Sequence, residues 1–250
     1  MTPNLSHPLG HGVSIMSKPT PPPPVTEIAF ILDRSGSMQP VTEAAITGFN
    51  EFLRDQQEAE IAGEGIARLT LVQFDDQYEV PIDNLPVSEV VGLDTRNYVP
   101  RGCTALLDAI GQTIESFHQR IKALPKAKRP TQVIFAIFTD GMENSSVKYS
   151  WLDIAGKIRR RREKDGWQFL FLAANQDAIA TAALINIHAH DSATSEYSDK
   201  GMRSSSRAFS RKIRAMRSSL NETAETMLNE DLAKPMEELL REEEDREGQA

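Results

Sequence analysis

The sequence predicts an α/β protein with a doubly wound, mostly parallel six-stranded sheet and helices on both faces. Two observations lead to this class. Short apolar runs alternate along the chain with longer stretches whose apolar residues recur at helical spacing, which is the order of elements in doubly wound folds. One pair of strand candidates is separated by only three residues, too few for a crossover helix, so one edge strand has to be antiparallel.

The first half of the chain supplies three strands and two helices. Residues 28–32 form a continuous apolar run, as expected for a strand that is buried on both faces. Residues 41–60 repeat apolar side chains at helical spacing, and residues 105–124 do the same. Between these helices, residues 68–74 and 78–82 are the two closely spaced strands, and the second of them is the predicted antiparallel edge strand.

The second half continues the alternation of apolar runs and periodic stretches. The expected strands are 133–138, 167–173 and 187–189, and the expected helices are 149–164, 177–185 and 199–219. In a doubly wound sheet the ligand crevice lies outside the carboxyl ends of the strands, where the strand order reverses. Residues that follow the strands are therefore the candidates for a functional site.

Oxygen-bearing side chains stand at these strand ends. Asp33, Ser35 and Ser37 directly follow the first strand, and Gly36 between the two serines lets the backbone bend. Asp140 holds nearly the same position behind the fourth strand. Carboxylate and hydroxyl oxygens suit a hard divalent cation such as Mg²⁺ or Mn²⁺, whereas the soft ligands that select zinc or copper are missing from these segments.

A third segment offers the hydroxyl group of Thr104. It stands between a turn that contains Pro100 and Gly102 and the start of the next helix. Taken singly, each of the three segments is also an ordinary turn or helix cap, because Asp, Ser, Thr and Gly end elements in many proteins. Their joint placement favours a shared metal site.

With these motifs, residues 25–220 resemble the von Willebrand factor type A (VWA) family. The metal-ion-dependent adhesion site of that family combines a D-x-S-x-S motif with a distant Thr and a distant Asp, which match Asp33, Ser35, Ser37, Thr104 and Asp140. The resemblance implies a Rossmann-like fold in which the three hydroxyl groups approach a bound Mg²⁺ or Mn²⁺ and the two carboxylates act largely through water. It also implies an open coordination position that attracts an acidic side chain of another protein.

The predicted function is therefore a metal-dependent protein-binding module rather than an enzyme. The alternative is a Mg²⁺-dependent phosphatase or hydrolase of the haloacid-dehalogenase-like type, with Asp33 as its nucleophile. Such enzymes place a second carboxylate two residues further on, where this chain has Ser35, and no general base is evident. The sequence has no P-loop motif, so any ATP would be used by a partner, and the family resemblance suggests an AAA+ ATPase of the MoxR or chelatase type.

The 250 residues suffice for one domain with flanking segments. We expect a disordered, proline-rich leader at 1–24, which lacks the basic start and apolar block of a secretory signal. No apolar stretch approaches the roughly 20 residues of a membrane span. The single Cys103 allows no intrachain disulfide, which favours a cytoplasmic location, and we expect this cysteine to be buried.

Charge changes sign near the C-terminus. Basic residues recur from Arg203 to Arg217, after which residues 221–250 carry eleven acidic and three basic residues. This tail matches the net charge of −8 of the whole chain, so the domain itself is near neutral and we expect no nucleic-acid binding. We expect a solvated or partly helical tail. The alternative is that one of its glutamates, held at high local concentration, occupies the open position of the metal.

Three weaker features keep alternatives open. Asp75 and Asp76 in the hairpin turn are expected to be solvated, with a contact at the rim of the metal site as the alternative. His188 and His190 alternate along the last predicted strand as zinc ligands would, but no third ligand is nearby. The basic run at 159–162 is expected to be a solvated helix end, with a nucleic-acid patch as the alternative.

Overall fold

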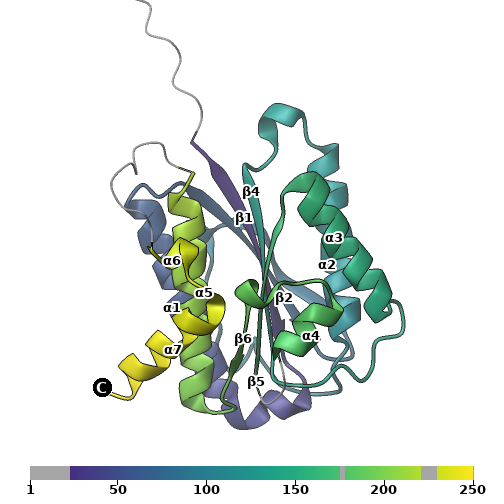
Figure 1. Ribbon diagram of the computed structural model, residues 1–250, viewed down its shortest axis with the longest axis vertical. Coiled ribbons are helices and arrows are strands. Elements are labelled where there is room, and N and C mark those ends of the chain that lie inside the picture. The colour runs from purple at the N-terminus through teal and green to yellow at the C-terminus, as the bar shows by residue number, and fades with distance from the viewer. Residues whose placement is uncertain (1–22, 175–177, 221–229, 250) are drawn as a thin grey trace, which may run out of the picture.

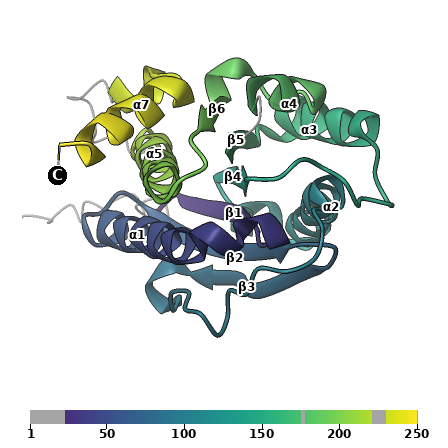
Figure 2. The same cartoon turned by 90° about the horizontal axis from the view of Figure 1, so that it is seen from below.

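The computed structural model describes residues 23–174, 178–220 and 230–249. It shows a six-stranded sheet with a layer of helices on each face (Figure 1, Figure 2). The expected leader at 1–24 lies outside the described residues except for its last two positions.

The sheet confirms the predicted fold class. It consists of β1 (Val25–Asp33), β2 (Ile66–Phe74), β3 (Tyr78–Pro86), β4 (Gln132–Thr139), β5 (Gln168–Ala174) and β6 (Ser192–Ser195). The strand order is β3-β2-β1-β4-β5-β6, and only the pair of β2 and β3 is antiparallel. The chain moves outward from β1 in one direction and from β4 in the other, so the strand order reverses between β1 and β4.

The prediction of a strand at 187–189 is wrong. Ile187 is buried outside any strand, and Ala189–Asp191 form the 3-10 turn η4. The sixth strand follows at Ser192–Ser195, whose Ser-Ala-Thr-Ser sequence lacks the apolar run that marks the other parallel strands. Because this edge strand is short and polar, hydrophobic periodicity points to the buried Ile187 instead.

Helices cover both faces, and each predicted helix overlaps one of them. On one face lie α1 (Thr42–Ile61), α5 (Asp199–Ser218), α6 (Glu230–Ala233) and α7 (Met236–Glu247), and on the other lie α2 (Leu106–Ala123), α3 (Trp151–Asp165) and α4 (Ala178–Leu184) (Figure 2). Short 3-10 turns at η1 (Gly36–Val41), η2 (Val87–Glu89) and η3 (Lys126–Lys128) complete the described elements.

The central strand β1 divides the core into two halves. Phe30 points toward α1 and α5, where its ring lies 5.3 Å from that of Phe49 and 5.9 Å from that of Phe209. Ala29 and Ile31 belong to the opposite cluster, under α2 and α3. This period-2 alternation places each side chain from Ile28 to Leu32 in one of two cores, and burial of a large apolar side chain stabilises the fold by about 1.5–3 kcal/mol.

The C-terminal tail packs on the domain through apolar contacts. Met236, Leu239 and Leu240 of α7 are at most 1% exposed and belong to the same core cluster as α1 and α5. The described part of the tail is helical, which is one of the two expected forms, and it packs on the domain. Its residues 221–229 lie outside the described ranges.

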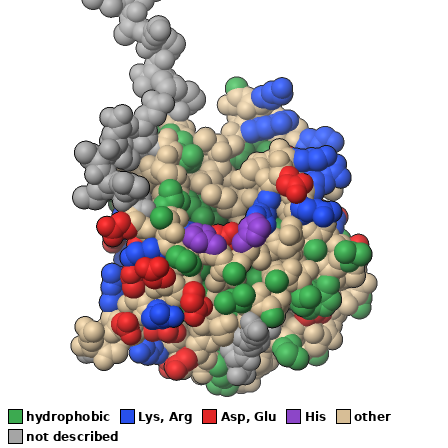
Figure 3. Space-filling view, in the orientation of Figure 1, with side chains coloured by type: hydrophobic (Ala, Val, Ile, Leu, Met, Phe, Trp, Pro, Cys, Tyr) green, Lys and Arg blue, Asp and Glu red, His purple; other side chains and the backbone are tan. Residues whose placement is uncertain are grey.

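Ion pairs surround this apolar contact. Arg211 of α5 contacts Asp231, Glu242 and Glu243 at N···O distances of 2.7, 2.7 and 2.9 Å. In Figure 3, acidic and basic side chains accordingly alternate at the lower left, over α5 and α7. The acidic tail therefore neutralises the basic helix that precedes it.

Two further observations concern the composition of the surface. Among the described residues, no helix is both long and apolar enough to cross a membrane. Cys103 is exposed, so the expectation that it is buried is wrong. It follows Gly102, whose φ of +66° is a left-handed backbone conformation that glycine adopts readily.

Candidate metal centre

The carboxyl ends of β1 and β4 lie side by side. The two strands pair in parallel from Thr26 with Gln132 to Leu32 with Phe138, so Asp33 and Asp140 both lie at the same edge of the sheet. Figure 2 looks onto this edge from below. The predicted site residues therefore lie at the reversal of the strand order, where doubly wound sheets bind their ligands.

Asp33 is completely buried, and its carboxylate accepts two hydrogen bonds. The backbone N–H of Ser35 donates to Oδ1 at 2.7 Å, and the Thr139 hydroxyl donates to Oδ2 at 2.5 Å. Burial nevertheless raises the pKa of Asp33 to about 7, and the nearby charge of Asp140 contributes to the rise. The folded protein thus holds a carboxylate whose charge is poorly compensated by its own side chains.

Asp140 is joined to the serines by a chain of hydroxyl contacts. Ser37 Oγ donates to Asp140 Oδ1 at 3.0 Å and lies 3.0 Å from Ser35 Oγ. The other oxygen of the carboxylate, Oδ2, is buried and has no hydrogen-bond partner among the described residues. Burial raises the pKa of Asp140 as well. A buried carboxylate oxygen without a donor is unfavourable unless a cation compensates it.

Thr104 reaches the same place from the third loop. A Cβ atom at Gly141 would lie 2.9 Å from Thr104 Oγ1, 3.4 Å from Ser37 Oγ and 3.7 Å from Ser35 Oγ. The three hydroxyl groups therefore converge on the space that the missing side chain of Gly141 leaves open. With the two carboxylates, all five predicted residues lie together at this edge.

The loop around Thr104 is held by residues that sequence patterns do not reveal. Thr104 N–H donates to Asn144 Oδ1 at 2.9 Å, and Asn144 N–H donates back to Thr104 O at 3.0 Å. Glu143 accepts from Leu107 N–H at 3.0 Å, so it caps the start of α2 from another loop. Tyr98 OH donates to the carbonyl oxygen of Asp33 at 2.6 Å. These partners come from distant segments, and nothing local in the sequence indicates their pairing.

The donor set fits a hard divalent cation. It contains two carboxylates and three hydroxyl groups, and no described lysine or arginine forms an ion pair with either carboxylate. Among the described residues, no group of three or more His, Cys, Asp or Glu is arranged to hold a metal ion, so the zinc alternative at His188 and His190 has no third ligand. Oxygen donors of this kind favour Mg²⁺ or Mn²⁺.

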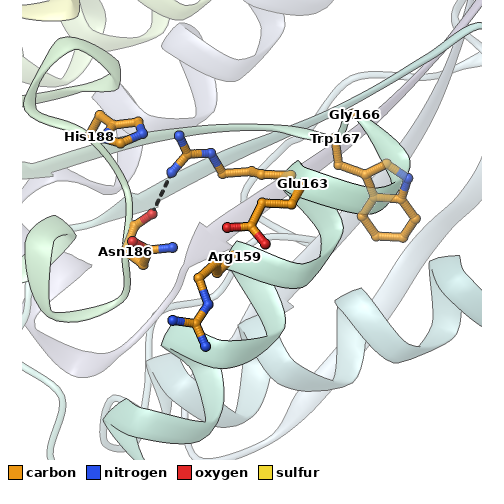
Figure 4. Close-up of a pocket in the computed structure, with 7 residues that line it drawn as sticks. Arg159, Glu163, Gly166, Trp167, Asn186 and His188 are labelled. Atoms are coloured by element: carbon orange, nitrogen blue, oxygen red, sulfur yellow. Dashed lines mark hydrogen bonds between the residues drawn. The ribbon is translucent and has the colours of Figure 1, made fainter.

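A separate pocket lies at the other end of the strands, near the amino end of β5. It has a volume of about 350 Å³ and is lined by Arg159, Arg162, Trp167 and His188, among others (Figure 4). Arg162 Nη1 donates to the carbonyl oxygen of Asn186 at 2.8 Å. Trp167 precedes β5, so this pocket is remote from the carboxyl ends of the strands and from the five oxygen donors.

The prediction that the basic run 159–162 is solvated is confirmed for only some of its residues. Arg159 and Arg160 are exposed, but Arg161 is only 7% exposed. Its guanidinium lies over the ring of Trp167 and pairs with Asp165 at 2.6 Å. Part of the basic run is therefore exposed to solvent, and Arg161 packs against the domain.

No family model matches the sequence, and no curated protein matches it. Solved structures do match. The pilus adhesin SpaC from Lactobacillus rhamnosus GG, in its open conformation, has a TM-score of 0.57 and 14% identity over 77% of this chain and 30% of SpaC. The vWF domain of the type V pili tip protein Mfa5 from Porphyromonas gingivalis has a TM-score of 0.52 and 12% identity over 76% of this chain and 95% of that domain.

These likenesses define the class of protein. The chain is a doubly wound α/β domain with an oxygen-rich cluster where the strand order reverses. More narrowly, it has the fold of a von Willebrand factor type A domain. At 12 to 14% identity the likeness concerns the fold alone, and this chain spans less than a third of SpaC.

Proposed function

We propose that the domain at residues 25–220 binds one divalent cation and uses it to capture an acidic side chain of a protein partner. The proposed cation ligands are Asp33, Ser35, Ser37, Thr104 and Asp140. The observation that carries the proposal is the convergence of three hydroxyl groups on the space beside Gly141, next to a buried carboxylate oxygen without a partner. A cation at this place would stabilise both carboxylates, because buried negative charges are poorly solvated and a nearby positive charge compensates them.

Mg²⁺ or Mn²⁺ is the proposed cation, because every donor is an oxygen. When bound, it supplies a positive charge and an exchangeable coordination position. Ser35, Ser37 and Thr104 would hold it through their hydroxyl groups, and the two aspartates would balance its charge, largely through water. A carboxylate of a partner would then bind the cation with a charge-assisted contact.

We propose that the domain binds and does not catalyse. A haloacid-dehalogenase-like phosphatase needs a nucleophilic oxygen that a substrate phosphate can reach, but Asp33 is completely buried and its carboxylate is held by hydrogen bonds from Ser35 and Thr139. The position of the second carboxylate in that class is Ser35, whose hydroxyl contacts Ser37. A phosphatase assay in the presence of Mg²⁺ tests this alternative directly.

We further propose an intracellular adaptor in the cytoplasm, with an AAA+ ATPase of the MoxR or chelatase type as its partner and no binding to nucleic acid or membrane. The near-neutral charge of residues 25–220 supports the absence of nucleic-acid binding. The structural relatives are a pilus adhesin and a pilus tip protein, which supports a binding role without bearing on the partner. The tail, whose described part packs on α5, is proposed as a stabilising extension of the domain.

Two measurements test the proposal. Calorimetric titration with Mg²⁺ and Mn²⁺ asks whether the folded protein takes up a cation. Affinity capture from cell extract then compares wild type with Asp140→Ala, each with Mg²⁺ and with EDTA, and Asp83→Ala serves as a control because Asp83 is an exposed aspartate of β3 outside the proposed metal loops. Proteins retained only by wild type and the control, and only with Mg²⁺, support the proposal. Absence of cation uptake contradicts it.

A further inference from the structure

The hairpin between β2 and β3 contains a buried carboxylate. Asp75 is completely buried, so the expectation that it is a solvated turn residue is wrong, whereas the neighbouring Asp76 is exposed, as expected. Asp75 Oδ1 accepts the backbone N–H of Gln77 at 2.6 Å, which shapes the turn. Its other oxygen points at two arginines.

Both arginines belong to loops that carry proposed cation ligands. Arg34, only 5% exposed, stands between Asp33 and Ser35, and its Nε lies 3.1 Å from Asp75 Oδ2. Arg101 stands three residues before Thr104, and its Nε donates to the same oxygen at 3.0 Å. One carboxylate oxygen thus joins the first and the second metal loop.

Glu79 on β3 closes this network from the other side. It accepts a hydrogen bond from Arg34 Nη1 at 2.8 Å and another from Arg101 Nη2 at 2.8 Å. Each guanidinium therefore contacts both carboxylates. Since Arg34 is buried, loss of its partners would leave a charge without compensation.

Backbone hydrogen bonds connect the same three segments. Arg34 N–H donates to Phe74 O at 2.8 Å, and Ala105 N–H donates to Asp75 O at 2.9 Å. Arg101 N–H donates to Arg34 O at 2.8 Å, which links the two metal loops directly. The hairpin is therefore the common support of the loop that carries Ser35 and the loop that carries Thr104.

The network also balances charge next to the proposed cation. Two guanidinium groups beside a divalent cation would repel it, but Asp75 and Glu79 supply two negative charges that offset them. The negative charges of Asp33 and Asp140 then remain for the cation. Loss of the Asp75 carboxylate would both loosen the two loops and leave a positive charge in excess.

We infer that Asp75 is a positioning residue for the cation site, which sets the distance between the Ser35 and Thr104 loops through Arg34 and Arg101. This inference rests on the proposed function, because it concerns the affinity of that site. It assigns a role in metal binding to a side chain that does not itself reach the cation.

The test is the affinity for Mn²⁺, measured by calorimetry on the full chain well below its melting temperature. We expect Asp75→Asn to weaken Mn²⁺ binding about 10-fold or more, as is typical of partners that orient metal ligands. The matched control is Glu27→Gln, which removes a carboxylate that is 4% exposed and pairs with Arg120 at 3.0 Å near the opposite end of β1. It also destabilises the fold, but its Mn²⁺ affinity should stay within about 2-fold of wild type, because it contacts no metal loop.

A milder variant keeps the test decisive if Asp75→Asn fails to fold. The Arg101 side chain is 48% exposed, so Arg101→Gln costs little stability but removes the link to the Thr104 loop. We expect a loss of affinity of several-fold, whereas Arg96→Gln, which breaks an exposed pair with Asp94, leaves the affinity unchanged. If wild type takes up no Mn²⁺, the proposed function fails. If wild type binds and both Asp75→Asn and Arg101→Gln bind equally well, the positioning role is refuted.

Discussion

Replacement of Asp33 by asparagine should stabilise the metal-free protein while it abolishes cation binding. Burial raises the pKa of Asp33 from its ordinary value of 3.8 to about 7. Between these two values the folded state binds a proton that the unfolded state has released, so the free energy of unfolding falls as the pH rises through this window. A difference of about 3 in pKa corresponds to at most about 4 kcal/mol, which wild type loses by pH 8 and Asp33→Asn does not.

The asparagine fits the existing hydrogen bonds. Its carbonyl oxygen replaces the acceptor of the Ser35 N–H, and its NH₂ group donates to Thr139 Oγ1. The Thr139 hydroxyl then donates to Gly141 O, which already lies 3.1 Å away. The substitution therefore removes the charge with little change in packing, and the pH effect is not masked by a cavity.

The assay is chemical denaturation in EDTA between pH 5 and pH 8, repeated at pH 8 with Mg²⁺. In EDTA at pH 8 we expect Asp33→Asn to be more stable than wild type, and the two should converge toward pH 5. With Mg²⁺ only wild type and the control Asp83→Asn should gain stability, because ligand binding stabilises the folded state. If Asp33→Asn is less stable than wild type in EDTA at pH 8, or if both show the same pH dependence, the reasoning is refuted.

Three other predictions follow from the structure. Gly141→Ala places a methyl group 2.9 Å from Thr104 Oγ1, so we expect the Mn²⁺ affinity measured by calorimetry to fall about 10-fold or more. The control Gly156→Ala, whose new Cβ meets no other part of the protein within 4 Å, should bind Mn²⁺ as wild type does. Leu239→Ala removes a completely buried side chain of α7 and should lower the free energy of unfolding by about 2–5 kcal/mol in urea; a loss below about 1 kcal/mol would show that the tail is not part of the core. Hydrogen bonds from Lys234 and Arg211 lower the pKa of Glu242, so the contact stabilises α7 above the ordinary carboxyl pKa of 4.5 and is lost as the pH falls below it. Amide hydrogen exchange of α7, corrected for intrinsic rates, should accelerate below that pH, and the same exchange in Glu242→Gln should depend less on pH.

Most of the fold could be predicted because the parallel strands are buried on both faces. The run Ile28 to Leu32 has no polar interruption, and only a central strand needs such a sequence. The two carboxylates could be selected for a related reason, since Asp33 and Asp140 each follow such a run, whereas the assignment of Thr104 rests on the motif of the VWA family. By contrast, β6 pairs along one edge only, with β5, and its Ser-Ala-Thr-Ser sequence carries no apolar pattern.

The partners of the site could not be predicted, because they depend on tertiary contacts. Asp75 lies in a polar turn sequence, Asp-Asp-Gln, which is typical of exposed hairpins. Its burial results from Arg34 and Arg101, 41 and 26 residues away in the chain, which approach it only once the sheet has formed. Asn144 likewise meets Thr104 across 40 residues. Local composition indicates which oxygens end the strands, but not which side chains hold the loops in place.

Contacts between distant segments also bear on the hypothesis that a glutamate of the acidic tail occupies the open position of the metal. Glu242 and Glu243 pair with Arg211, and Glu247 pairs with Arg203 and Arg207, so each of these glutamates would have to leave its arginine before it reached the cation. Deletion of residues 222–250 would also uncover the apolar surface of α5 on which α7 packs, so a change in partner affinity after deletion would not by itself identify a tail ligand. Substitution of single tail glutamates leaves that surface covered, so a change in partner affinity would then identify a tail ligand. Three of the described tail glutamates, Glu242, Glu243 and Glu247, thus already have cationic partners within the chain, and for these three a role as metal ligand would cost an ion pair.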